Sequence, residues 1–504
     1  LVWPLRLLVP EQEVVIMGAA SDSSGVSLIR DTPNGPVEGI QSGSVERFLG
    51  IPYASAPVGG QRFALPILPA SWTTPFSATR HGPTPAQAPY PGTLGELLPT
   101  RIIPGEQSLN LNIFAPAMNG AALRPVLLWI HGGSLEHGSN ALPGYDGSNF
   151  ARDGVIFVAV NYRLGAEGFS VLKDAPLNLG LADVMAALEW VKANIASFGG
   201  DHERVTLMGH SAGGSLVAAL LAHPRAVSLV SRAIIHSAPL PAQPVKNAGR
   251  ITRKIAAELG IAATREGFCS RSQADLVQAR SKVAAGSNPL EGGPAYSLAI
   301  KAPLVPTDPY QALLGGAAKD IPLLMGTTTA EARLWLAHTG YDTKPTGIQL
   351  ALLRHKAGIS KEVHRLFARN RPAESPGEIL GALATDMLLR VPMYKLADAR
   401  HYAQAPTHVY EFSWPSPVAG LGAAHGTELP FVFDNLETAD AIGLVGDSAP
   451  RALASAMHET WVCFATRGVV DWPAWDLRRP VKTFDGNTNP VVLSPREDEA
   501  AALD

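Results

Sequence analysis

One serine in this sequence stands among small residues, in the stretch GHSAGG at residues 209 to 214. The pentapeptide Gly209-His210-Ser211-Ala212-Gly213 has the G-x-S-x-G spacing of a nucleophile elbow. At such an elbow a strand turns sharply into a helix, and glycine leaves room for the two backbones to approach each other. The apolar run before the serine predicts the strand, and the run SLVAALLAH after it predicts the helix. Ser211 is therefore the candidate nucleophile.

A serine hydroxyl becomes a good nucleophile only when a base takes its proton and a carboxylate orients that base. In the elbow arrangement the chain order is Ser, then Asp or Glu, then His, each on a loop that follows a strand. The predicted strand DIPLLMG runs into TTTAEARLW, which places Glu331 in such a loop. The predicted strand THVYEFSW precedes a Gly/Ala-rich run that ends at His425. We expect Glu331 to be the acid and His425 the base.

Other side chains compete for these two roles. For the acid, Glu428 is too near His425 in sequence to support it from an independent loop, and Asp386 opens a predicted helix. The competing histidines fall in predicted helices, in surface segments or beside the start of a strand: His338, His355, His364, His401, His408 and His458.

The elbow chemistry also needs backbone N–H donors for the oxyanion that forms on the substrate. The stretch IHGGSLEHGS supplies a small-residue loop directly after a predicted strand, with Gly132, Gly133 and Ser134 as candidates. Ala212 is a further candidate donor, because it begins the helix after the elbow.

These candidates need a scaffold that brings loops after successive strands together. The runs PVLLWIHGG and GVIFVAVNYRLG predict strands buried on both faces, and residues 181–200 predict an amphipathic helix that Gly199 and Gly200 end. Three further strands are predicted in RAIIHSAP, DIPLLMGTT and THVYEFSW. The alternation predicts an α/β fold with a large, mostly parallel sheet flanked by helices, whose strands point their carboxyl ends at the site.

We expect one domain over residues 21–504, preceded by a poorly defined extension at residues 1–20. Mostly helical insertions at about 242–319 and 331–406 are expected to roof the site. The apolar N-terminal stretch is interrupted by Pro4, Arg6 and Pro10, so it is a poor targeting segment. A cytoplasmic location is favoured, and a secreted or periplasmic one follows if this segment is a leader.

Composition excludes several classes of function. The net charge is −3 and no segment is rich in Lys or Arg, so the sequence predicts no basic surface for binding nucleic acid. No run of about 20 apolar residues predicts a membrane span. The two cysteines, Cys269 and Cys463, form no metal-ligand or redox motif and are expected to be unpaired. Metal-protease, nucleotide and dinucleotide motifs are missing from the sequence, so no metal or organic cofactor is expected.

Several blocks in order resemble the type-B carboxylesterase family, which includes bacterial p-nitrobenzyl esterases, mammalian carboxylesterases and cholinesterases. The likeness extends over nearly all of residues 26–495. The blocks include RFLGIPYASAPVGGQRF, EQSLNLNIFAP, NYRLGAEGF, the long run from NLGLADV to GHSAGG, AAHGTELPFVF and WVCFATRG. This resemblance implies the α/β-hydrolase fold.

The resemblance also implies roles for individual residues. It makes Ser211 the nucleophile, Glu331 the acid and His425 the base. It assigns the oxyanion donors to Gly133, Ser134 and Ala212. Ser237 matches a family serine close to the acid, which implies a supporting hydrogen bond.

The chain departs from the family pattern at a few positions. His210 stands where many members have Glu, and Ser134 stands where Gly or Ala is usual, so the polar network under the elbow and the acyl pocket are expected to differ. Pro85 and Ser108 replace a family disulfide pair, and Cys269 lacks its family partner. These departures point to a bacterial member without disulfides.

The expected reaction is hydrolysis of small-molecule carboxylic esters through an acyl-enzyme on Ser211. Alternatives with the same triad are amide, carbamate or lipid-ester hydrolysis. A non-catalytic adhesion or binding protein of the same fold is a further alternative, and complete Ser, Glu and His candidates argue against it. The sequence indicates neither the oligomeric state nor the natural substrate.

Overall fold

The structure is a computed structural model of the full chain. It describes residues 25–118, 120, 122–285, 295–336, 354–355, 358–418 and 420–503. The predicted N-terminal extension at residues 1–20 lies outside these ranges, as does His338.

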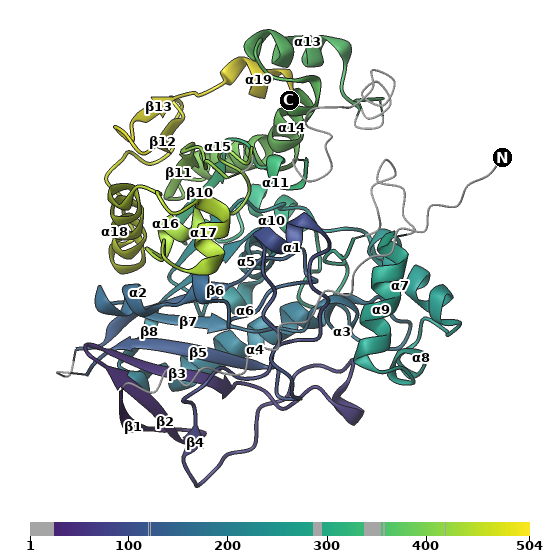
Figure 1. Ribbon diagram of the computed structural model, residues 1–504, viewed down its shortest axis with the longest axis vertical. Coiled ribbons are helices and arrows are strands. Elements are labelled where there is room, and N and C mark those ends of the chain that lie inside the picture. Colours follow the sequence, from purple (N-terminus) through teal and green to yellow (C-terminus); the bar gives the residue numbers. More distant parts are fainter. Residues whose placement is uncertain are drawn as a thin grey trace.

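A single twisted sheet runs through the molecule, with the N-terminal strands at one edge and the C-terminal strands at the other (Figure 1). The strand order is β1-β2-β3-β5-β7-β6-β8-β9-β10-β11-β12-β13, and β4 pairs with β2. The strands are β1 Val26–Thr32, β2 Gly35–Ser42, β3 Val45–Pro52, β4 Phe76–Ser77, β5 Asn110–Pro116, β6 Arg124–Ile130, β7 Ile156–Val160, β8 Gly200–His210, β9 Arg232–His236, β10 Leu323–Thr328, β11 Thr407–Phe412, β12 Pro480–Phe484 and β13 Val491–Leu493.

The strands from β7 to β12 in this order are parallel to one another, and antiparallel strands flank them at both edges. Alternate residues of β6 enter two different cores. Val126, Leu128 and Ile130 pack on one face of the sheet, and Leu127 and Trp129 pack on the other. Both faces are therefore covered, which explains why this strand is apolar without a break.

Helices form the layer on each face. Core residues of α4, α5, α7, α10 and α15 belong to one apolar cluster, and those of α2, α16, α17 and α18 belong to the other. The helices are α1 Thr93–Leu97, α2 Ser148–Arg152, α3 Gly165–Phe169, α4 Leu179–Asn194, α5 Ala212–Leu221, α6 Pro224–Val227, α7 Val245–Leu259, α8 Arg265–Cys269, α9 Gln273–Ala285, α10 Pro309–Leu314, α11 Arg333–Leu336, α13 Lys361–Asn370, α14 Pro376–Thr385, α15 Val391–Tyr402, α16 Leu429–Val432, α17 Ala439–Val445, α18 Arg451–Arg467 and α19 Glu497–Ala502. A π-helical turn, Asp386–Arg390, joins α14 to α15.

This architecture confirms the predicted α/β-hydrolase fold, a large and mostly parallel sheet flanked by helices. One predicted boundary was wrong. The helix over residues 181–200 ends at Asn194, a 3-10 turn follows at Ile195–Phe198, and Gly199 closes the turn in the left-handed conformation while Gly200 already begins β8. Helices occur in both segments predicted as insertions, and the division of the chain into one domain with two inserted segments stays a prediction.

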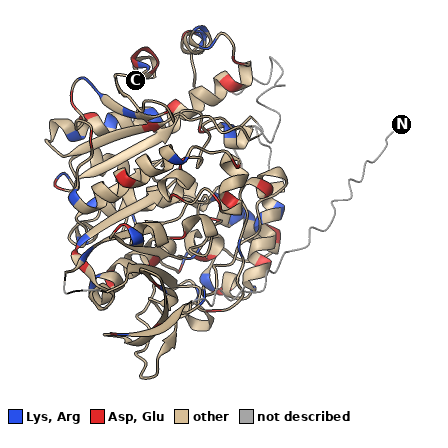
Figure 2. Cartoon of the chain, turned by 60° about the vertical axis from the view of Figure 1, so that its left-hand side comes forward, with Lys and Arg blue, Asp and Glu red and all other residues tan. Residues whose placement is uncertain are grey.

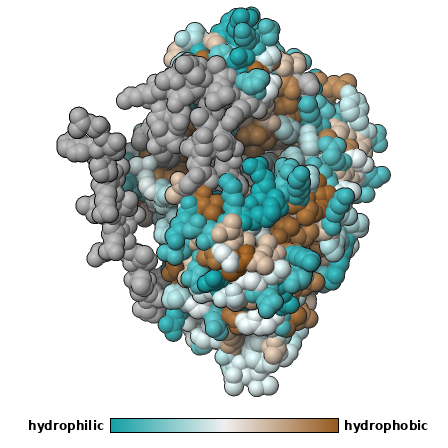
Figure 3. All heavy atoms as spheres, turned by 90° about the vertical axis from the view of Figure 1, so that its right-hand side faces the viewer, coloured by the Kyte–Doolittle hydropathy of each residue, from teal (hydrophilic) through white to brown (hydrophobic). Residues whose placement is uncertain are grey.

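Charged side chains of both signs are distributed over the outer helices and loops (Figure 2). On the face shown in Figure 3, hydrophilic and hydrophobic residues are interspersed. Within the described ranges, no helix has the length and apolar character that crossing a bilayer requires. Cys269 and Cys463 are both free thiols.

Candidate active site

The elbow lies where β8 meets α5. Ser211 joins the two elements with φ of +54°, a positive value that is uncommon for a residue with a side chain. A Cβ added to Gly209 would lie 2.5 Å from the backbone of Gly213, and one added to Gly213 would lie 2.0 Å from the carbonyl oxygen of Ile130. The strand, the helix and the neighbouring β6 are thus too close for any side chain at these two positions.

The predicted acid and base are in direct contact. His425 Nδ1 lies 2.6 Å from Glu331 Oε2, and both residues are buried, with 5% and 1% of their surfaces exposed. Because an ionised carboxylate only accepts hydrogen bonds, Nδ1 must be the protonated nitrogen, which leaves Nε2 free to accept a proton. The second Glu331 oxygen, Oε1, accepts from the backbone N–H of Thr328 at 2.7 Å. Glu331 is therefore fixed at both oxygens.

Ser237 does not support the acid as the resemblance implies. Its Oγ has no hydrogen-bond partner among the described residues. The backbone N–H of Ser237 donates instead to the carbonyl of Gly326 at 2.8 Å.

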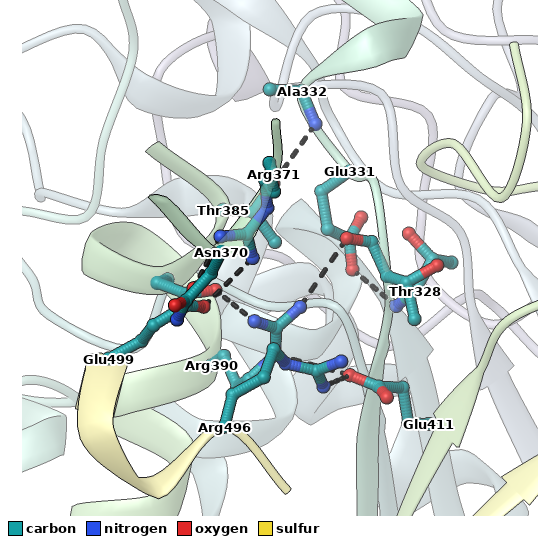
Figure 4. Close-up of polar contacts among 12 residues, drawn as sticks. Thr328, Glu331, Ala332, Asn370, Arg371, Thr385, Arg390, Glu411, Arg496 and Glu499 are labelled. Atoms are coloured by element: carbon teal, nitrogen blue, oxygen red, sulfur yellow. Dashed lines mark hydrogen bonds and ion pairs between the residues drawn. The ribbon is translucent and has the colours of Figure 1, made fainter. Parts of the chain in front are cut away.

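A cluster of ion pairs contacts the loop that carries Glu331 (Figure 4). Arg390 binds Asp386 and also Glu411, and it donates to the Thr329 carbonyl at 3.4 Å. The Ala332 N–H donates to Thr385 Oγ1 at 3.4 Å.

The C-terminal segment joins the same cluster. Arg496 binds Glu411, and Arg371 binds Glu499 of α19. Asp386, a rival for the acid role, is thus engaged by an arginine. These contacts tie α14, β11 and α19 to the loop of Glu331.

The other rival acid, Glu428, lies beside two other histidines, His210 and His236. It is fully buried, and its Oε1 is 3.7 Å from His210 Nε2 and 3.6 Å from His236 Nδ1. Burial, together with the charge of Glu331, raises the pKa of Glu428 to about 8. Burial also lowers the pKa of His210 well below its usual value.

The rival histidines that the structure describes have other surroundings. His364 lies in α13, His401 in α15, His408 in β11, and His458 in α18, where its Nδ1 is 2.8 Å from the Val432 carbonyl. His355 belongs to the short stretch of residues 354–355, which lies between α11 and α13 in the sequence.

The predicted oxyanion loop turns directly after β6. Gly133 and Ser134 both have positive φ, +106° and +57°, and the Gly133 carbonyl accepts from the N–H groups of Glu136 and His137 at 2.9 Å. The N–H groups of Gly133 and Ser134 themselves donate to no acceptor within the described part of the chain. Ala212 begins α5, where the first N–H groups of a helix have no acceptor inside it. Gly132 packs against His210 and Ser211.

One pocket brings these groups together. Ser211, His425, Gly133 and Ser134 all line it, and it holds about 960 Å³ of space including its open mouth. The rest of its wall is mostly apolar or aromatic: Leu97, Leu98, Pro99, Leu142, Leu334, Leu429, Leu444, Tyr90, Tyr145 and Trp335. Trp335 covers the imidazole of His425, with ring centroids 4.7 Å apart. A nucleophile, a carboxylate-oriented imidazole and free N–H donors in one apolar pocket are suited to acyl transfer.

Sequence reasoning missed several residues around this pocket. His236 lies beneath the elbow, where its carbonyl accepts from the Ser211 N–H at 2.8 Å. Its position at the end of the strand beside β8 could have identified it. No pattern pointed to the backbone donor of Thr328 or to Trp335 over His425.

A model of the carboxylesterase family matches residues 26–491. A para-nitrobenzyl esterase of Bacillus subtilis is 35% identical, over 88% of this chain and 92% of the relative. A phenmedipham hydrolase of Pseudarthrobacter oxydans is 32% identical, over 94% of this chain and 97% of the relative. Among solved structures, carboxylesterase EST55 of Geobacillus stearothermophilus has a TM-score of 0.84 at 32% identity, over 94% of this chain and all of that chain.

Proposed function

This chain belongs to the carboxylesterase family and is an ester hydrolase, and we propose that it cleaves carboxylic esters through an acyl-enzyme on Ser211. The observation that carries the proposal is the 2.6 Å contact between Glu331 and His425 Nδ1 in the pocket that Ser211 also lines. That contact leaves His425 Nε2 unprotonated and so able to act as a base.

In the first half of the reaction, the Ser211 hydroxyl proton passes to His425 Nε2 as Oγ bonds to the ester carbonyl carbon. The carbonyl oxygen takes the negative charge, and the N–H groups of Gly133, Ser134 and Ala212 donate to it. Loss of one such donor costs about 10²–10³ in kcat in comparable sites. The tetrahedral intermediate then expels the alcohol, which takes the proton from His425.

In the second half, a water molecule gives its proton to His425 Nε2 and attacks the acyl carbonyl. The same N–H donors hold the second oxyanion. Ser211 Oγ leaves with the proton from His425, which releases the acid and restores the enzyme. Glu331 stays ionised throughout and stabilises the imidazolium that forms twice.

The pocket supports esters with an apolar body as substrates. Leucine and aromatic side chains form most of its wall, and burial of each substrate methylene against such a wall is worth about 0.8 kcal/mol. The names of the two relatives refer to different compounds, para-nitrobenzyl esters and phenmedipham, so membership of the family does not select one substrate.

Hydrolysis of a p-nitrophenyl ester series from acetate to palmitate tests the proposal. The parent is compared with Ser211→Ala and His425→Ala, for which we expect a loss of kcat of about 10³-fold or more. Ser215→Ala is the matched control, because Ser215 Oγ lies one turn further along α5 and donates to the Pro239 carbonyl at 2.6 Å. Turnover that survives in Ser211→Ala, or that falls equally in Ser215→Ala, would contradict the proposal.

Matched ester and amide substrates with the same acyl group then separate the alternatives. We expect kcat/KM to be larger for the ester. A larger value for the amide would favour an amidase with the same triad. Failure of Ser211 to react with a fluorophosphonate would favour a non-catalytic protein of this fold.

A further inference from the structure

A buried, unpaired histidine and carboxyl lie directly behind the proposed base. His210 ends β8 and precedes Ser211, and Glu428 follows His425 by three residues. His210 Nε2 and Glu428 Oε1 are 3.7 Å apart, and 7% and 0% of the two side chains are exposed. Within the described residues, His210 Nε2 and both Glu428 oxygens have no hydrogen-bond partner. The backbone N–H groups of Gly426 and Glu428 favour the ionised carboxyl, but burial outweighs them, so an ionised Glu428 would be costly.

His236, the other histidine beside Glu428, does not neutralise it. The indole of Trp461 donates its N–H to His236 Nε2 at 3.0 Å. Because an indole N–H can only donate, Nε2 carries no proton and the ring hydrogen lies on Nδ1. His236 Nδ1 is 2.8 Å from the Tyr410 hydroxyl, closer than its 3.6 Å to Glu428. Burial lowers the pKa of His236 to about 3, so this ring is neutral.

The titratable groups that face Glu428 come from the surrounding strands and loops: His210, His236, Tyr410, Tyr145, Glu331 and His425. Among the described residues, no lysine or arginine forms an ion pair with Glu428. Burial and the nearby charge of Glu331 raise the pKa of Glu428, and burial lowers that of His210. Both side chains therefore favour their neutral forms.

We propose that His210 Nε2 and Glu428 Oε1 share one proton, so that this pair carries no net charge behind His425 at neutral pH. The neutral carboxyl is the donor and the neutral imidazole is the acceptor. The two atoms are 3.7 Å apart, so sharing the proton requires the side chains to move toward each other to hydrogen-bond length. His210 and Glu428 are positioning residues, because they act through His425.

The consequence for catalysis rests on the proposed role of His425 as the base. The rings of His210 and His425 are 4.5 Å apart, so a charge on the pair would act directly on the His425 imidazolium. A glutamate in place of His210 would give two carboxyls that, sharing one proton with each other, carry a charge of −1. The neutral pair of His210 and Glu428 adds no such charge beside the His425 imidazolium, so we expect activity to extend toward acidic pH.

Two substitutions at position 210 test this account through the pH dependence of kcat/KM for p-nitrophenyl acetate. His210→Glu introduces a negative charge beside His425, and we expect the acid limb to move up by about 1 pH unit or more. His210→Gln keeps a neutral acceptor for the Glu428 proton, and we expect its acid limb to stay within about 0.3 unit of the parent. Equal shifts in both variants would overturn the proposal, since they would reflect packing rather than charge.

Glu428→Gln provides a readout that does not depend on turnover. The infrared spectrum of the parent in D₂O at pH 6 is expected to contain a protonated-carboxyl band that is missing from the variant. Loss of a carboxylate band in the variant, in place of the protonated-carboxyl band, would overturn the proposal. If Ser211→Ala kept its activity but the band assignment held, the proposed function would fail while the shared proton would stand.

Discussion

Replacing Glu331 with Gln isolates the electrostatic contribution of the acid in the proposed triad. The change keeps the size of the side chain, and an amide oxygen can still accept from the Thr328 N–H. The amide NH₂ would then face His425 Nδ1, which makes Nδ1 the acceptor and places the ring hydrogen on Nε2. His425 would thus hold its hydrogen on the nitrogen that has to take one from Ser211.

The size of the effect follows from the geometry. The contact is 2.6 Å long, charge-assisted and almost wholly buried, so solvent weakens it little. The equivalent change in a Ser-His-Asp protease costs about 10⁴ in kcat. We expect a loss of about 10³–10⁴, or about 4–5.5 kcal/mol of transition-state stabilisation. KM should change little, because Glu331 is not among the residues that line the pocket.

The assay is p-nitrophenyl acetate hydrolysis, with rates normalised to the fraction of folded protein. Asp386→Asn is the matched control, because Asp386 is a buried carboxylate that binds Arg390 rather than His425. We expect this control to lower the melting temperature but to keep kcat within about tenfold. A loss below tenfold in Glu331→Gln, or an equal loss in both variants, would refute the assignment of the acid.

Further predictions concern stability. Gly213→Ala places a Cβ 2.0 Å from the Ile130 carbonyl oxygen and should lower the free energy of unfolding by about 2 kcal/mol or more. In the control Gly60→Ala the new Cβ meets no atom within 4 Å, and the free energy of unfolding should change by less than about 0.5 kcal/mol. Urea unfolding measures both values. Arg390→Ala leaves Asp386 and Glu411 buried with less compensation and should cost about 3–5 kcal/mol, whereas Arg451→Ala, in an exposed pair with Glu437, should cost less than about 1 kcal/mol. Equal costs for these two arginines would contradict the structural role of the cluster. The folded-state pKa of Glu428, about 8, is above its unfolded value, so its contribution to stability is complete below about pH 4.5 and is lost as the pH rises through 8. Melting temperatures from pH 5 to pH 9 should therefore fall more steeply for the parent than for Glu428→Gln, and parallel curves would contradict the raised pKa.

The central part of the fold could be predicted from the sequence because its patterns are local. The strands that became β6 and β7 contain short apolar runs, the second half of β8 is mostly apolar up to the elbow, and α4 has helical spacing. The antiparallel strands β1, β2 and β3 were not predicted. Much of β1 is exposed or half-buried, so its residues lack the apolar run that identifies the buried strands.

Part of the candidate site could likewise be predicted from the sequence, and part could not. Loop order after successive strands was enough to select Glu331 and His425, and the two are in contact. The surroundings of Glu428 could not be predicted, because they depend on three segments that are distant in sequence. The end of β8, the end of β9 and the loop after β11 meet there only once the sheet has formed.

The central claim is that the acyl group of the substrate is carried by Ser211. Rapid acid quench of the enzyme during turnover of a p-nitrophenyl ester, followed by peptide mass spectrometry, tests it most directly. We expect one acyl group per chain, located on Ser211 and absent from Ser211→Ala. An acyl group on another residue, or steady turnover with no covalent adduct at any quench time, would contradict it.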